Sequence, residues 1–104
     1  MDLTVLAVPD CPNAPVLERR LAMALAGWPG VTVSRRVIAD EAEAGRWGMY
    51  GSPTLLLNGQ DPFAEPDAVA MVACRLYRGE DGGLEGAPTV AALRRVLEQA
   101  AALG

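Results

Sequence analysis

The sequence predicts a single α/β domain over residues 1–104, with the element order β-α-β-α-β-β-α and a mixed four-stranded sheet flanked by helices. Three observations support this prediction. Short apolar stretches rich in β-branched residues alternate with segments whose apolar residues recur at helical spacing. The chain of 104 residues has the usual length of one domain. Hydrophobic residues make up 51% of it, which is enough for a core without disulfides or metal.

The first half of the chain predicts two strands and two helices. Residues 3–8 (LTVLAV) are apolar and end at a Pro-Asp pair, as expected of a buried strand. Over 14–26 the apolar residues recur on one face, which predicts a helix. Residues 31–38 alternate as a half-exposed strand does. Residues 40–49 begin with acidic side chains, which suit the positive end of a short helix.

The second half predicts a hairpin and a final helix. Residues 54–58 (TLLLN) form a second apolar strand, and 72–77 (VACRLY) are expected to pair with it as an antiparallel neighbour. The connection over 59–71 contains two prolines and predicts an irregular loop. The final helix is expected over 89–102. A parallel βαβ unit followed by a hairpin gives the mixed four-stranded sheet.

Composition excludes several function classes. A net charge of −4 and a pI near 4.6 argue against nucleic-acid binding, which needs clustered positive charge. The nine basic residues are all Arg, so a Schiff-base lysine is absent, and the lack of His removes Ser-His-Asp and Cys-His mechanisms. No stretch approaches the roughly 18 apolar residues of a membrane span. With two cysteines 63 positions apart, we expect a soluble protein of the reducing cytoplasm.

The motif PDCPNAP (9–15) places Cys11 between the first strand and the first helix. Free N–H groups and the positive end of the helix dipole stabilise a thiolate at such a position, while the neighbouring Asp10 opposes it. The sequence therefore favours a functional thiol. The alternative is a small, partly buried hydrophobic residue.

A second motif, GSPTLLLNG (51–59), places the Ser52-Pro53 bond at the mouth of a buried strand. This bond is a candidate cis peptide, because the cis form of an X-Pro bond costs only about 0.5–1 kcal/mol. The alternative is an ordinary trans proline at the first position of a strand.

The two motifs and the order of elements resemble the thioredoxin/glutaredoxin superfamily over nearly the whole chain, most specifically in MYGSPTLLLNG. The resemblance implies that Cys11 is the catalytic thiol, that a cis Pro53 packs against it, and that backbone groups of Ser52 and Thr54 hold the substrate. More narrowly, CPN, GSPTLLLNGQDPFA and CRLYR are similar to small bacterial thioredoxin-like proteins that are often labelled alkylmercury-lyase-like.

The sequence departs from thioredoxins at Ala14, where the resolving cysteine of a C-x-x-C pair would stand. Cys74 is the other candidate for a second thiol. In the expected sheet it lies roughly 10 Å short of the Pro53 end and roughly another 10 Å across the strands from Cys11. A disulfide needs Cα atoms within about 7 Å, so we expect Cys74 to be a buried structural thiol.

Three functions follow from these motifs. The leading hypothesis is glutaredoxin-like thiol–disulfide exchange by the single thiol Cys11, with a peptide or glutathione as thiol or disulfide substrate. The second is a protein that binds soft metals or organomercurials through thiolates. The third is a redox-inactive thioredoxin-like interaction module. We expect no resident cofactor and no built metal site; glutathione would enter as a co-substrate.

Overall fold

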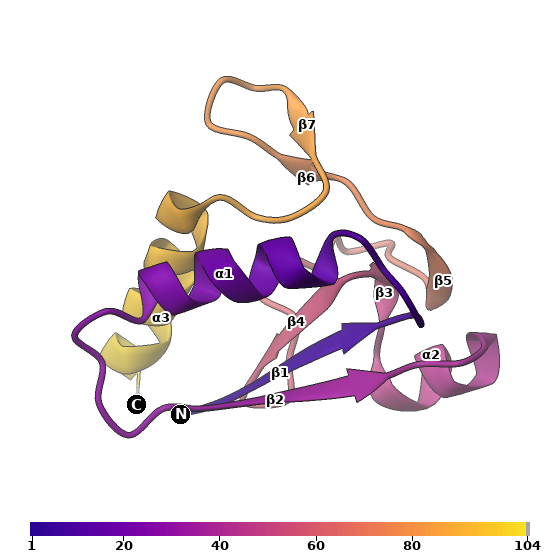
Figure 1. The fold of residues 1–104 in the computed structure, drawn as a ribbon, viewed down its shortest axis with the longest axis horizontal. Coiled ribbons are helices and arrows are strands. Elements are labelled where there is room, and N and C mark those ends of the chain that lie inside the picture. Colours follow the sequence, from indigo (N-terminus) through magenta and orange to yellow (C-terminus); the bar gives the residue numbers. More distant parts are fainter. Residues whose placement is uncertain (104) are drawn as a thin grey trace.

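The main sheet of the protein has three strands. The structure, a computed structural model, describes residues 1–103 (Figure 1). β1 (Asp2–Ala7) lies in the middle, β2 (Thr32–Val37) pairs with it in parallel, and β4 (Thr54–Leu57) pairs with it antiparallel. The predicted mixed α/β architecture is confirmed, and each of these three strands lies within one residue of its expected bounds.

Two short strand pairs complete the described β structure. β3 (Tyr50–Ser52) pairs in parallel with β5 (Met71–Cys74). β6 (Tyr77–Arg78) pairs antiparallel with β7 (Leu84–Glu85). In Figure 1 the β6–β7 pair projects from the body of the molecule above α1.

The expected four-stranded sheet is not formed by the described residues. We expected 72–77 beside 54–58, but β5 joins β3 instead: the N–H of Met71 donates to the carbonyl of Met49 at 3.1 Å, and the N–H of Arg75 donates to that of Ser52 at 3.0 Å. The long loop after β4 lets the chain return to the start of β3 and run in the same direction. Consecutive strands are neighbours only about two-thirds of the time.

The helices cover the two faces of the sheet unequally. α1 (Ala14–Ala24) and α3 (Val90–Leu103) lie on one face, and α2 (Glu41–Trp47) covers one end of the other (Figure 1). These bounds agree with the predicted helices to within two residues. No helix of the described chain is long and apolar enough to cross a membrane.

The core divides along the alternation of the strands. Successive side chains of a strand point to opposite faces, so Leu3 and Val5 pack under α1 and α3 while Leu6 packs on the α2 side. On the first face the fully buried partners from the other elements are Leu17, Leu21, Leu55, Leu93 and Leu97.

The start of α2 supplies a first testable prediction. A carboxylate oxygen of Asp40 accepts the N–H of Glu43 at 2.9 Å, and the Glu43 side chain accepts the N–H of Ala39 at 3.2 Å. Asp40→Ala removes the cap and should lower the free energy of unfolding by about 1 kcal/mol, measured by urea denaturation. Asp40→Asn keeps an acceptor and should cost much less. Equal costs for the two variants would contradict a capping role.

Candidate functional site

Cys11 lies where the sequence predicts it, in the turn that joins β1 to α1. Its N–H donates to the carbonyl of Val8 at 3.2 Å, and its carbonyl accepts the N–H of Ala14 at 3.3 Å. Asp10 has φ +58°, a left-handed conformation that Asp tolerates better than most residues. The turn therefore presents Cys11 at the head of α1, where the helix dipole favours negative charge.

The Cys11 side chain is largely enclosed. It is 6% exposed and packs against Ala7, Val8 and Ala14. Its accessible edge lines an open concavity of about 590 Å³, which Arg35 and Val37 border from β2.

The Ser52-Pro53 bond is cis, as the motif GSPT indicated. One residue connects this bond to the cysteine turn: the Ser52 hydroxyl accepts the N–H of Val8 at 3.0 Å, and the carbonyl of Val8 accepts the N–H of Cys11. The structure thus brings Cys11 and the proline segment to the same end of the sheet. Ser52 is 2% exposed and Thr54 is fully buried.

The carbonyls around the cis bond already have partners inside the protein. The Ser52 carbonyl accepts the N–H of Arg75, the Pro53 carbonyl accepts the Tyr77 hydroxyl at 2.5 Å, and the Gly51 carbonyl accepts the Thr54 hydroxyl at 2.6 Å. We expected backbone groups of Ser52 and Thr54 to hold a substrate. The Ser52 carbonyl, however, already accepts a hydrogen bond from inside the protein, so it is less available to a substrate. β5 already occupies the hydrogen-bonding edge of β3.

A buried ion pair supports this segment, and the sequence analysis did not identify it. The Arg75 guanidinium contacts a carboxylate oxygen of Asp61 at 2.5 Å and the Thr54 hydroxyl at 3.1 Å. The Asp61 side chain is 1% exposed and that of Arg75 is 11% exposed. The available signal was an arginine inside the apolar run VACRLY, because a charged side chain there needs a buried partner.

Tyr77 connects this ion pair to the cis proline. Its ring lies under the Arg75 guanidinium, 4.6 Å from the Cζ atom to the ring centroid, and its hydroxyl donates to the Pro53 carbonyl. Burial is the main cause that raises the pKa of Tyr77; the Arg75 charge opposes this increase, and the Asp61 charge adds to it. The phenol therefore stays protonated and remains a hydrogen-bond donor.

Cys74 does not have the predicted environment. It is exposed, whereas we expected a buried structural thiol, because β5 lies at the edge of the molecule beside β3 rather than inside the sheet. Its register partner is Ser52. Both cysteines are free thiols. Within residues 1–103, no group of three or more His, Cys, Asp or Glu side chains is placed to hold a metal ion.

The site thus consists of a largely buried thiol at a helix head, a cis proline segment hydrogen-bonded to the same turn, and an Arg-Asp-Tyr cluster behind that segment. These parts allow nucleophilic chemistry at sulfur, and the chain contains no histidine that could act as its base. Comparisons of the chain with protein-family models, with curated proteins and with solved structures find no match.

Proposed function

We propose that the protein is a thioredoxin-like, single-thiol exchange protein in which Cys11 reacts with disulfides of the glutathione type. The observation that supports this most is the hydrogen-bonded path from the Cys11 N–H through Val8 to the Ser52 hydroxyl. It fixes the thiol relative to the cis proline segment. Cys11 also lies just before Asn13, the N-cap residue of α1.

The proposed reaction has two exchange steps. The Cys11 thiolate attacks the glutathione sulfur of a mixed disulfide, forms a Cys11–glutathione disulfide and expels the substrate thiolate. A second glutathione thiolate then attacks the glutathione sulfur on Cys11, which releases oxidised glutathione and restores the Cys11 thiolate. Ala14 stands where a C-x-x-C enzyme has its second thiol, so the external thiol performs the release step.

The concavity beside Cys11 sets the kind of substrate that fits this reaction. Because Cys11 is only 6% exposed, a small or extended disulfide reaches it more easily than one inside a folded protein. Arg35 at the border of the concavity supplies a positive group, which also forms an ion pair with Glu18 at 3.4 Å. A glutathione carboxylate would compete with Glu18 for this arginine.

Two cysteine variants test the proposal. The reduced protein is incubated with oxidised glutathione, the adducts are located by peptide mass spectrometry, and turnover is measured with a small glutathione mixed disulfide. We expect Cys11→Ser to reduce turnover to the uncatalysed rate because it removes the attacking sulfur. Cys74→Ser should keep most of the activity and the adduct on Cys11.

The outcomes separate the alternatives. The exchange proposal is wrong if the Cys11→Ser variant keeps its turnover. It is also wrong if the glutathione adduct forms only on Cys74 while Cys11 stays unmodified. Circular dichroism of both variants checks that they remain folded. A parallel titration with phenylmercuric acetate measures whether mercurial binding depends on Cys11. If Cys11 is a purely structural thiol, it should form neither the glutathione adduct nor the mercurial adduct.

A further inference from the structure

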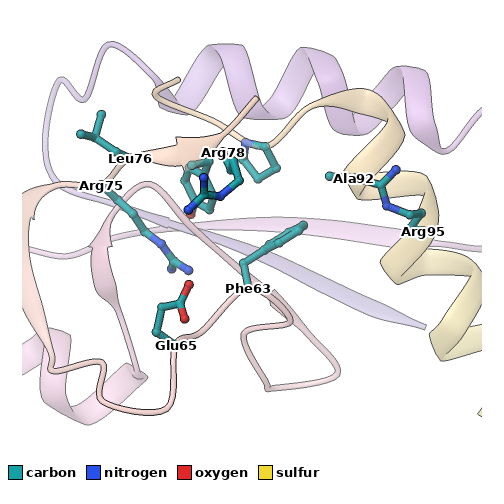
Figure 2. Close-up of a pocket in the computed structure, with 9 residues that line it drawn as sticks. Phe63, Glu65, Arg75, Leu76, Arg78, Ala92 and Arg95 are labelled. Carbon is teal, nitrogen blue, oxygen red and sulfur yellow. The ribbon is translucent and has the colours of Figure 1, made fainter. Parts of the chain in front are cut away.

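A second cavity shares no lining residue with the concavity beside Cys11, but Arg75 and Tyr77 of the cluster behind the cis proline segment line it. Its volume is about 300 Å³, at the lower end of the range for small-molecule sites. Three segments form it: the loop after β4, residues 75–78 up to the end of β6, and the start of α3 with the proline that precedes it. Figure 2 shows Phe63, Arg78 and Arg95 around it.

The arginines that line the cavity differ in whether a carboxylate neutralises their charge. Arg75 is bound by buried Asp61, and Figure 2 shows the Glu65 side chain near the Arg75 guanidinium. Arg95 lies 3.5 Å from Glu80, but both side chains are more than half exposed, so water and salt screen this pair.

Arg78 differs from the other two arginines. Among the described residues it has no carboxylate within ion-pair distance, and it lines the same cavity as Arg95. Arg78 enters the cavity wall from β6 and Arg95 from α3, and the positive charge of Arg78, which no carboxylate of the described residues neutralises, favours an anionic group beside it. Arginine is well suited to this task because its planar fork matches a carboxylate.

The rest of the lining is apolar and well supported. The Phe63 ring packs edge-on against the Tyr77 ring, with centroids 5.8 Å apart and planes at 86°. A carboxylate of Asp61 accepts the N–H of Phe63 at 2.8 Å, which fixes the loop that carries the ring. Pro88 and Ala92 close the cavity from the α3 side. The apolar side chains of this part of the lining suit a flat apolar part of a ligand better than a second charged group of that ligand.

We propose that this cavity binds a small aromatic carboxylate, with the carboxylate at Arg78 and the ring against Phe63. The proposal does not depend on thiol chemistry at Cys11. Glu65 and Asp61 act against a dianion, because they place negative charge at the Arg75 end of the cavity. A monoanion whose charge lies at the Arg78 end avoids this repulsion.

The test uses benzoate as the probe, titrated into the full-length ¹⁵N-labelled protein and followed by amide chemical shifts. We expect shifts centred on Phe63, Arg78 and Ala92. Arg78→Gln should weaken benzoate binding about tenfold, because a hydrogen bond to a charged group is lost. Arg94→Gln is the matched control: Arg94 precedes Arg95 on the same helix, is exposed and does not line the cavity.

Neutral and purely inorganic probes complete the experiment. Benzyl alcohol has a similar ring without the charge, and inorganic phosphate has the charge without the ring; both should bind more weakly than benzoate at these amides. The proposal is overturned if benzoate gives no shifts here, if either probe matches it, or if Arg94→Gln weakens binding as much as Arg78→Gln. The amide spectrum of each variant without ligand verifies its fold.

Discussion

Replacing Asp61 with asparagine is expected to lower the free energy of unfolding by about 3–5 kcal/mol, the usual cost of breaking a buried ion pair. The two side chains have nearly the same shape, but asparagine is uncharged and has an N–H₂ group in place of one of the two oxygens that accept hydrogen bonds from Arg75 and Phe63. The substitution leaves the Arg75 guanidinium, which is 11% exposed, without its counter-charge. Arg75 also donates to Thr54 and lies over Tyr77, so the loss reaches the segment beside Pro53.

Urea denaturation of four proteins measures this effect: the wild type, Asp61→Asn, Arg75→Met and the double variant. Each single variant leaves the other side chain buried without its partner. We therefore expect the double variant to be more stable than the sum of the two single losses implies. Glu18→Gln is the control, since the exposed pair of Glu18 with Arg35 should contribute less than about 1 kcal/mol. Additive losses in the double variant would show that the Arg75–Asp61 contact is not a coupled pair.

The elements that local pattern determines were predictable from the sequence. Helical spacing and strand alternation placed all three helices and the three strands of the main sheet within two residues of their observed bounds. The partner of 71–74 was not predictable in this way. It depends on how a long loop returns to β3, and local periodicity contains no information about that return.

The residues of the candidate site also fall into those that the sequence could identify and those that it could not. Cys11 and the cis Pro53 could be identified because each stands in a short motif at a junction between elements. Asp61 and Arg75 are 14 residues apart and come together only when the loop folds over β4 and β5. The exposure of Cys74 was misjudged for the same reason as the sheet: with β5 placed inside the sheet, the thiol had to be buried.

The second large effect is expected for Gly51→Ala, which should lower the free energy of unfolding by at least about 2 kcal/mol. Gly51 has φ +101°, a conformation that side chains other than glycine rarely adopt. A Cβ atom here would lie 2.9 Å from the Cβ of Arg75 and 3.3 Å from the carbonyl oxygen of Ala73. The substitution therefore forces β5 away from β3 as well as straining its own backbone.

Gly27→Ala separates these two causes. Gly27 has a similar positive φ of +85°, but a Cβ atom there meets nothing within 4 Å, so this variant should show only the backbone strain. Hydrogen exchange adds a direct readout: the Arg75 N–H, which donates to Ser52, should lose protection in Gly51→Ala and keep it in Gly27→Ala. If 72–77 instead paired with 54–58, as the sequence pattern predicted, Gly51 would not meet Arg75. The two glycine variants would then lose similar stability, and that result would reject the β3–β5 pairing.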